Sequence, residues 1–329
     1  MKNIIKIFLL LISISSISFS KDTNKFDKIV KEYKKIYRTD SIVVAIYDNN
    51  TNKMVYVSDK ELAKDYKYIA SSIMKPIIVS IALKNNLVKK EDLFFLHNDG
   101  LVDLEGRYPR SRYKVNRTIV KDTKEYTKQY FNYEEILLNS SNVGMSQLAQ
   151  KIDTKDYIQG LKDFGFLSTQ EIIDINEWVD DMDKYIYDGI NEVKSAYSYG
   201  SLFVSTFDEI LNAYIQFNLS NPTVINENIQ SQIKNILIEK SKNQLLEIND
   251  KENVQVGIYT GSSQICIKRQ YLDKYIASTF GFVNYKNKKY TIGVIIIDPF
   301  VQDEFQIFKY PGYSSTVLFT EIVNKLTKK

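Results

Sequence analysis

Apolar runs of strand length lie towards both ends of this chain and predict a sheet built from both. Residues 42–47 and 54–57 are such runs, and the polar, turn-rich residues 48–53 between them are typical of a hairpin. The C-terminal third predicts four more strands and a closing helix, over residues 254–259, 263–267, 276–285 and 289–297 and from about 315 to 326. Strands that return after a long interval favour a sheet that is completed by the end of the chain.

The segment between these strands has a helical pattern. A helix is expected to begin near Ser72, because Pro76 suits a first helical turn and the apolar residues 77–83 follow it. Further helices are expected at 133–138, 147–152 and 206–217. The expected fold is therefore α/β of the α+β type, in which helices flank a central antiparallel sheet and a mostly helical subdomain is inserted at about residues 86–224.

The N-terminus has the pattern of a secretory signal peptide. Lys2 and Lys6 lie at the start of an apolar run over residues 4–17, and the small residues Ser18 and Ser20 precede Lys21. We expect residues 1–20 to be this signal, with an uncleaved anchor as the alternative, and residues 21–329 to form one domain. Either reading predicts an extracytoplasmic protein, periplasmic or anchored in the membrane and facing outward.

Composition and charge exclude several classes of function. The 329 residues contain 44 Lys and Arg and 40 Asp and Glu, and the two signs are interspersed, so the net charge of +4 does not predict nucleic-acid binding. The single cysteine, Cys266, cannot form an internal disulfide. The single histidine, His97, leaves no usual zinc ligand set, and a Ser-His-Asp triad would have to use it, although no nucleophile motif lies beside it.

A Ser-x-x-Lys pattern at Ser72 and Lys75 is the leading candidate for chemistry. On a helix this spacing places both side chains on one face, where a desolvated lysine can act as the base for a serine nucleophile. The pattern recurs by chance in a chain rich in serine and lysine. Its weight comes from the motifs that follow in order, Ser140-Ser-Asn142 and Tyr259-Thr-Gly261.

These motifs and their flanks resemble the catalytic domain of serine penicillin-binding proteins, most closely the class B transpeptidases. Residues 72–76, Ser-Ile-Met-Lys-Pro, match the first motif with its trailing proline. Residues 139–145 and 256–264 match the second and third motifs with their flanks. The likeness covers roughly residues 40–326 and implies a β-lactamase/transpeptidase-like fold.

The resemblance implies serine acyl transfer. Ser72 would attack the carbonyl of the penultimate D-Ala of a peptidoglycan stem peptide, expel the terminal D-Ala and form an acyl-enzyme. Lys75 would accept the proton of Ser72, and Ser140 would relay a proton to the leaving amine. Asn142 would orient Lys75 and the substrate amide. Transfer to an amine of a second stem peptide makes a cross-link, whereas transfer to water makes the enzyme a D,D-carboxypeptidase.

The third motif is expected to bind the substrate through Tyr259, Thr260, Gly261 and Ser262. The backbone N–H groups of Ser72 and Ser262 would form an oxyanion hole, and the hydroxyls of Thr260 and Ser262 would receive the substrate carboxylate. The implied partners are peptidoglycan stem peptides and, as covalent inhibitors, β-lactams, with membrane association through the N-terminus as an option. Neither a cofactor nor a metal is implied.

Tyr259 is a departure from the family pattern, which has lysine at this position. A neutral phenol supplies a weaker hydrogen bond than an ammonium group does. Carboxylate binding and proton relay should both weaken, and we expect Lys268 or Arg269 to compensate from the adjacent turn.

Two alternatives remain open from the sequence. A secreted serine β-lactamase shares the fold, but residues 177–180, Glu-Trp-Val-Asp, do not match the class A Glu-x-x-Leu-Asn loop, and Asn142 replaces the valine usual in class D enzymes. A weakly active or inactive penicillin-recognising homologue would explain Tyr259. The retained set Ser72, Lys75, Ser140 and Asn142 favours the transpeptidase.

Overall fold

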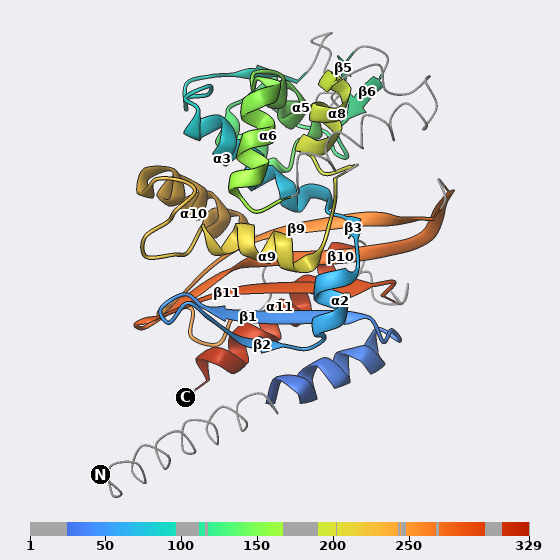
Figure 1. The fold of residues 1–329 in the computed structure, drawn as a ribbon, viewed down its shortest axis with the longest axis vertical. Coiled ribbons are helices and arrows are strands. Elements are labelled where there is room, and N and C mark those ends of the chain that lie inside the picture. The colour runs from blue at the N-terminus through green and yellow to red at the C-terminus, as the bar shows by residue number, and fades with distance from the viewer. Residues whose placement is uncertain are drawn as a thin grey trace, which may run out of the picture.

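A five-stranded antiparallel sheet in the order β2-β1-β11-β10-β9 forms the centre of the molecule (Figure 1). The computed structural model describes residues 25–96, 112–115, 118–166, 190–201, 203–242, 244, 248–267, 270–299 and 311–328. The strands of the sheet are β1 (Ile42–Asp48), β2 (Lys53–Val57), β9 (Val254–Ile267), β10 (Gln270–Tyr285) and β11 (Lys288–Ile297). Because β1 pairs with β11, the predicted sheet built from both ends of the chain is confirmed.

Alternate residues of each strand face two different hydrophobic layers, as the two-residue period of a strand requires. Val43 and Ala45 of β1 belong to a cluster shared with α3 (Lys75–Lys84), α9 (Phe207–Ile215) and α10 (Glu227–Lys242). Ile42, Val44 and Ile46 face the opposite side. There they join a cluster with α11 (Pro311–Thr327), the predicted closing helix, and with a helix over residues 25–36.

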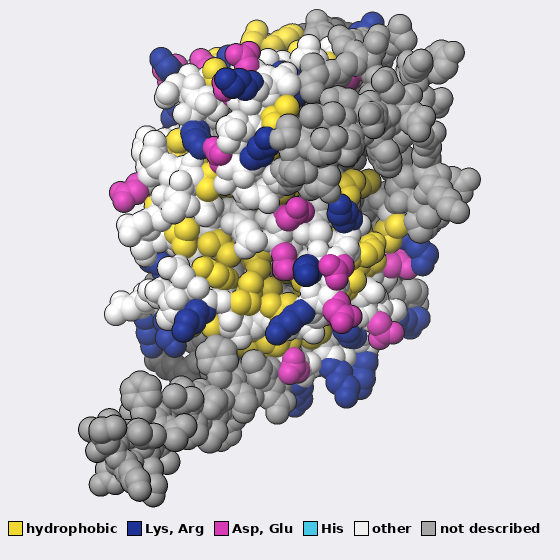
Figure 2. Space-filling view, viewed as in Figure 1, with side chains coloured by type: hydrophobic (Ala, Val, Ile, Leu, Met, Phe, Trp, Pro, Cys, Tyr) yellow, Lys and Arg dark blue, Asp and Glu magenta, His cyan; other side chains and the backbone are white. Residues whose placement is uncertain are grey.

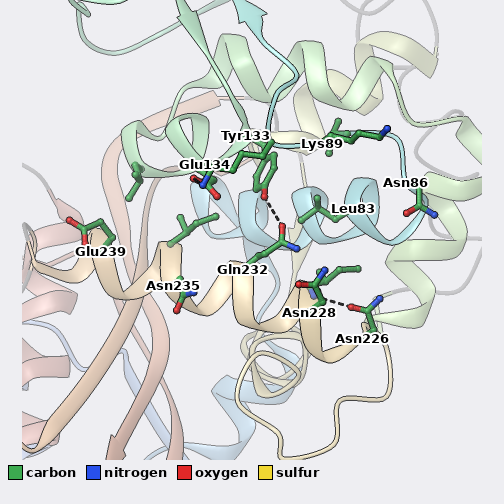
Figure 3. Close-up of a pocket in the computed structure, with 15 residues that line it drawn as sticks. Leu83, Asn86, Lys89, Tyr133, Glu134, Asn226, Asn228, Gln232, Asn235 and Glu239 are labelled. Carbon is green, nitrogen blue, oxygen red and sulfur yellow. Dashed lines mark hydrogen bonds and ion pairs between the residues drawn. The ribbon is translucent and has the colours of Figure 1, made fainter.

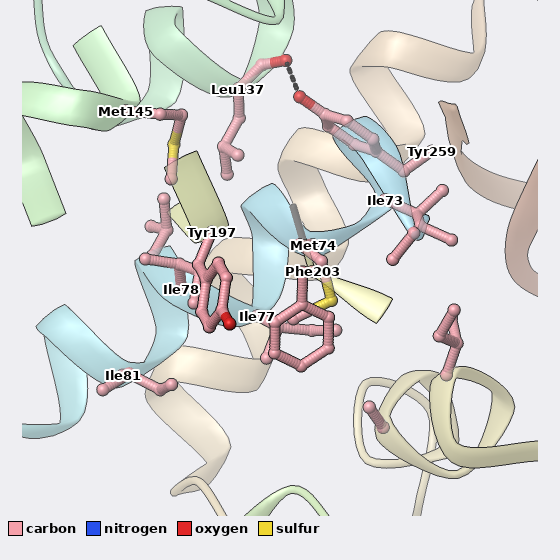
Figure 4. Packing of buried hydrophobic residues seen from close by; sticks show 14 of the residues in the cluster. Ile73, Met74, Ile77, Ile78, Ile81, Leu137, Met145, Tyr197, Phe203 and Tyr259 are labelled. Carbon is pink, nitrogen blue, oxygen red and sulfur yellow. Dashed lines mark hydrogen bonds between the residues drawn. The ribbon is translucent and has the colours of Figure 1, made fainter. Parts of the chain in front are cut away.

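Helix α3 lies inside the larger of the two clusters (Figure 4). A 3₁₀ turn, η1 (Ser71–Met74), leads into it, and Pro76 occupies its first turn, as predicted. Every residue from Lys75 to Ala82 is buried. A helix that is apolar on all sides is typical of a protein core, so the lysine at its first position is held inside the protein.

The segment between the two halves of the sheet contains helices together with short strands. The helices are α2 (Lys60–Asp65), α4 (Tyr133–Asn139), α5 (Asn142–Gln150), α6 (Thr154–Asp163) and α8 (Ile190–Ser198). The strands β3 (Tyr68–Ile69), β4 (Phe94–Phe95), β5 (Arg112–Val115), β6 (Thr118–Lys121), β7 (Tyr130–Phe131) and β8 (Val204–Ser205) pair as β3–β8, β4–β7 and β5–β6. Helix α5 begins earlier than predicted because Ser141 caps it, accepting a hydrogen bond from the backbone N–H of Gly144.

The third motif does not interrupt its strand, and the predicted break at residues 260–262 was wrong. Thr260, Gly261 and Ser262 continue the pairing of β9 with β10. Turn-forming residue types suggested a break, but the glycine has a packing role. A Cβ atom on Gly261 would lie 2.8 Å from Ser278 Oγ and 3.2 Å from Ile73 Cγ2. Glycine therefore lets the strand pass close to η1.

Helix α10 has no counterpart in the predictions, although the sequence contains a signal for it. Ile229, Ile233, Ile236 and Leu237 recur at helical spacing and are buried. The side chain of Asn226 accepts a hydrogen bond from the N–H of Ile229, as a helix-capping residue does. This helix packs against β9 and the end of α4, next to the predicted site.

The space-filling view shows basic and acidic side chains intermixed over one face of the protein, which agrees with the interspersed charges of the sequence (Figure 2). Within the described ranges, no helix combines the length and apolar character needed to cross a membrane. Several sequence predictions lie outside the described residues: the signal over residues 1–20, His97, residues 177–180, and the pair Lys268 and Arg269.

Candidate active site

The side chain of Lys75 lies at the centre of the predicted site and joins two of its other members. Its Nζ atom is 2.6 Å from the backbone oxygen of Ser140, 3.3 Å from Ser140 Oγ and 2.7 Å from Asn142 Oδ1. Lys75 has no exposed surface, and burial is the main cause that lowers the pKa of Lys75 to about 7. The amine can therefore exchange a proton near neutral pH, as a general base must.

Three charged side chains act on Lys75 from other elements. Asp122, which follows β6, raises the pKa of Lys75, whereas Lys240 of α10 and Lys124 lower it. The carboxylate of Asp122 thus opposes the effect of burial, and the two lysines add to it. The sum keeps the proton affinity of Lys75 low although an acid lies nearby.

Ser72 lies in η1, one turn before Lys75, and is partly exposed. The preceding residue, Ser71, has a φ of 62°, which residues other than glycine rarely adopt. Its N–H donates to the backbone oxygen of Gly200 at 3.0 Å, and a Cβ atom on Gly200 would lie 1.8 Å from the Ser71 oxygen. The Ser72 hydroxyl makes no hydrogen bond within the described part of the chain. This turn therefore presents Ser72 in a fixed backbone position with its hydroxyl available to a substrate.

Ser140 and Asn142 lie where α4 ends and α5 begins. Ser140 terminates α4 with a φ of 58°. The buried carboxylate of Asp122 accepts hydrogen bonds from the backbone N–H groups of Asn142, at 2.5 Å, and Val143, at 3.1 Å, and from the hydroxyl of Ser141 at 2.9 Å. A carboxylate at a helix N-terminus is stabilising because those N–H groups lack partners within the helix. Asp122 thereby holds the second motif in place.

Tyr259 is fully buried on β9 and contacts Ser140 rather than solvent. Its hydroxyl donates to the backbone oxygen of Leu137 at 2.9 Å (Figure 4) and is 3.2 Å from Ser140 Oγ. A phenol has one hydrogen, so Ser140 donates to Tyr259 in the second bond. Burial raises the pKa of Tyr259 further above its usual range, and the group stays a neutral hydroxyl. With the Ser140 hydrogen used there, Ser140 Oγ can accept from Lys75.

The remaining residues of the third motif lie along the edge of the sheet, beside η1. Thr260 is partly buried and Ser262 is exposed. The Ser71 hydroxyl accepts from the backbone N–H of Ser262 at 3.1 Å and donates to its backbone oxygen at 2.7 Å. The N–H that was predicted to serve as an oxyanion donor is therefore already bonded to the chain itself. A substrate carbonyl would have to displace the Ser71 hydroxyl.

A groove of about 770 Å³ lies between α3, α4 and α10 but contains none of the predicted site residues (Figure 3). Amide side chains such as Asn226, Asn235 and Gln232 line it, and Gln232 accepts a hydrogen bond from the hydroxyl of Tyr133 at 2.6 Å. The candidate active site is therefore identified by the contacts among its side chains and lies outside this groove.

Sequence reasoning missed three residues that shape the site: Ser71, Asp122 and Lys240. Asp122 and Lys240 belong to no motif and lie far from Lys75 in sequence, so the sequence carries no signal that they approach Lys75. Ser71 adjoins the first motif, but its left-handed backbone is unusual for serine and could not be predicted.

Comparisons with known proteins cover most of the chain. The family model described as penicillin binding protein transpeptidase domain matches residues 38–323. Peptidoglycan D,D-transpeptidase FtsI of Buchnera aphidicola subsp. Schizaphis graminum is 23% identical over 301 residues, which cover 85% of this chain and 49% of that protein. A peptidoglycan D,D-transpeptidase FtsI homolog of Mesostigma viride is 30% identical over 105 residues, which cover 30% of this chain and 15% of that protein. The chain thus spans about half the length of these curated relatives, or less.

Solved structures share the arrangement of helices and strands. The TP domain of penicillin-binding protein 3 from Burkholderia pseudomallei superposes with a TM-score of 0.72 at 16% identity, and the match covers 93% of each chain. At this identity the likeness shows the fold alone. The two chains therefore share a fold.

Proposed function

This chain belongs to the family of penicillin-binding protein transpeptidase domains, and on that premise we propose that it is a serine D,D-transpeptidase that acts on D-Ala-D-Ala stem peptides and is acylated by β-lactams. The observation that carries the proposal is the contact of a buried lysine, Lys75, with both Ser140 and Asn142. A non-catalytic binding module would have no need to bury a lysine that titrates near neutral pH between two such residues.

The number of hydrogen bonds to Lys75 supports a proton-transfer role. Three acceptor atoms suit an ammonium group, which has three N–H donors, whereas the neutral amine has two N–H groups and a lone pair. The contact with Ser140 Oγ, at 3.3 Å, is the longest of the three. Loss of the proton would release this contact first and free a lone pair to accept a proton from Ser72.

In the proposed first step, Ser72 Oγ bonds to the penultimate D-Ala carbonyl carbon while its proton passes to the lone pair of Lys75. Collapse of the tetrahedral intermediate breaks the C–N bond, and the proton reaches the leaving amine through Ser140. An acceptor amine then attacks the ester carbonyl, the C–O bond to Ser72 breaks, and the proton that the amine loses returns to Ser72 Oγ. No external oxidant, reductant or metal takes part in this scheme.

We assign the residues of the third motif either to substrate binding or to support of the site. Thr260 and Ser262 remain the residues proposed to receive the substrate carboxylate, and the N–H groups of Ser72 and Ser262 the proposed oxyanion donors. Tyr259, which has no exposed surface, would act through Ser140. Gly261 would keep the strand close to η1.

The cellular context is likewise proposed. Action on peptidoglycan would take place outside the cytoplasm, consistent with residues 1–20 as a secretory signal or an uncleaved anchor. Residues 21–329 would form the transpeptidase-like domain, with its helical subdomain at about residues 86–224. Membrane association, where present, would occur through the N-terminus.

The intact mass of the protein after mixing with a penicillin tests this function against a β-lactamase. We expect a mass increase of one penicillin per chain that persists for many minutes, because a transpeptidase site directs an amine rather than water to the ester. Continued consumption of excess penicillin over many turnovers would instead identify a β-lactamase. Failure to form any adduct would support the inactive homologue.

A further inference from the structure

A second buried lysine, Lys240, lies behind Tyr259. It lies on the buried face of α10 and is 5% exposed. Its ammonium nitrogen is 3.0 Å from the backbone oxygen of Leu137, 2.9 Å from that of Leu138 and 4.5 Å from the centre of the Tyr259 ring. Burying an ammonium group is costly unless it is compensated. The buried ammonium group of Lys240 must therefore be stabilised by its neighbours.

The partners of Lys240 belong to the end of the helix that presents Ser140. Leu137 and Leu138 are in the last turn of α4, where carbonyl groups lack the α-helical partner four residues on and the helix dipole is negative. A cation over the face of an aromatic ring is attracted by the ring quadrupole. Two carbonyl oxygens and one ring face thus stabilise the ammonium form of Lys240.

A short series of contacts joins Lys240 to the predicted relay. The Leu137 oxygen accepts from both Lys240 and the Tyr259 hydroxyl. The Tyr259 hydroxyl contacts Ser140 Oγ, which in turn contacts Lys75 Nζ. Both Lys240 and Lys75 also donate to backbone oxygens at this helix end, those of Leu137 and Ser140 respectively. The two ammonium groups therefore bind carbonyl oxygens of the same helix terminus.

We propose that Lys240 is a positioning residue for the acyl transfer, and that its positive charge, placed against Tyr259 and the carboxyl end of α4, opposes protonation of Lys75 as the pH falls, so that Lys75 can still accept a proton from Ser72. The proposal rests on the function proposed above. Tyr259 is neutral and supplies no charge from β9, whereas the ammonium group of Lys240 reaches the Tyr259 ring from α10.

The other charges around these two lysines act in known directions. Asp122 favours a proton on Lys75, and Lys124, which lies on the same segment as Asp122, disfavours one on Lys75 and on Lys240. Burial, with Lys124 as a smaller cause, lowers the pKa of Lys240 to about 7. Tyr126 and Tyr259 are buried phenols whose pKa values burial raises, so they remain uncharged. Below pH 7 both lysines bind protons, and each proton opposes the other.

Lys240→Gln removes the charge and keeps a donor for the carbonyl oxygens of α4. The pKa of Lys75 should rise when this charge is lost, so acidic pH should suppress acylation of the variant more strongly. When the rate of penicillin acylation is plotted against pH, we expect the acidic limb of the curve to move to a pH higher by about half a unit or more. The acylation rate of the variant at pH 6 should then be roughly threefold lower than that of the wild type. The rate on the alkaline plateau should change little. A purely structural role would lower the rate equally at all pH values.

Two further variants keep the test decisive. Lys240→Arg retains the charge and should restore the wild-type limb. Lys234→Met removes another partly buried lysine of α10, which contacts the Phe282 ring and Asn218 instead of the site, and should leave the limb in place. If Lys240→Gln does not fold, Lys240→Met tests the same loss of charge.

The outcomes separate this inference from the proposed function. A wild-type protein that acquires no penicillin would overturn the proposed function. A wild-type protein that is acylated with an acidic limb, together with a Lys240→Gln variant whose limb lies at the same pH, would overturn the role of Lys240 alone. An upward shift in Lys240→Gln that Lys240→Arg reverses supports the role.

Discussion

Replacement of Ser72 by alanine is expected to abolish covalent labelling by penicillin completely. The hydroxyl of Ser72 is the proposed nucleophile, it lies in the turn directly before Lys75, and it is partly exposed. Alanine retains the backbone and removes only the oxygen that would form the ester. Wild-type protein should gain the mass of one penicillin, and Ser72→Ala should gain none under the same conditions.

Ser71→Ala is the matched control for this prediction, since it removes the neighbouring hydroxyl. The Ser71 side chain bonds to the backbone of Ser262, so its loss can change the acylation rate, but the endpoint should still be one penicillin per chain. Peptide mapping should locate the adduct on Ser72 in both wild type and Ser71→Ala. Labelling that survives in Ser72→Ala and disappears in Ser71→Ala would contradict the prediction, because it would identify Ser71 as the nucleophile.

Lys75→Met should reduce the rate of acylation by about 10² to 10⁴-fold, the usual contribution of a general base. Methionine is of similar length and apolar, so the buried volume is largely kept while the proton acceptor is lost. Binding of penicillin before the covalent step should change less than the step itself. Stopped-flow measurement with a fluorescent penicillin separates the two.

If Lys75 is the general base, the acylation rate should fall as the pH is lowered. Lys75 has a pKa lowered to about 7, and only its neutral form accepts a proton, so the wild-type rate should fall roughly tenfold per unit as the pH drops below 7 and should level off above it. Lys84→Met serves as the control. Lys84 is the last residue of the same helix, and its Nζ atom forms an ion pair of 2.6 Å with Asp163, which is not a residue of the site. A wild-type rate that is flat from pH 5 to 8 would argue against Lys75 as the base.

Hydrophobic spacing was sufficient to predict the framework of the molecule. The β1–β2 hairpin, the C-terminal strands and α11 have clear periodicity, because each strand must face two apolar layers or each helix one. We predicted a break in β9 because Gly261 and its neighbours resemble a turn, and this prediction was wrong. At that position the glycine provides space for η1, which depends on a contact distant in sequence.

The site was predictable only where residues belong to motifs. Lys75, Ser140 and Asn142 lie in hydrogen-bond contact, and Ser140 also contacts Tyr259, but their catalytic and binding roles remain proposals. Asp122 and Lys240 could not be found from the sequence, since an isolated acid and an isolated lysine in a chain with 84 charged residues resemble ordinary surface groups. Only the folded chain brings their charges to Lys75.

The helix that was not predicted illustrates the same limit. The repeat of isoleucine and leucine in α10 indicates a helix with one buried face, and Lys240 lies on that face. The expected compensation for Tyr259, at Lys268 or Arg269, was based on nearness in sequence. Lys240 approaches the Tyr259 ring from a separate helix, so spatial nearness leads to a different candidate.

Incubation with a donor that ends in D-Ala-D-Ala, or its thioester analogue, together with an acceptor amine tests the central claim most directly. We expect mass spectrometry to detect an acyl-enzyme on Ser72, release of the leaving group, and a product in which the acceptor amine carries the acyl group, with none of these in Ser72→Ala. Absence of an acyl-enzyme and of both aminolysis and hydrolysis products from the wild-type protein would contradict the account.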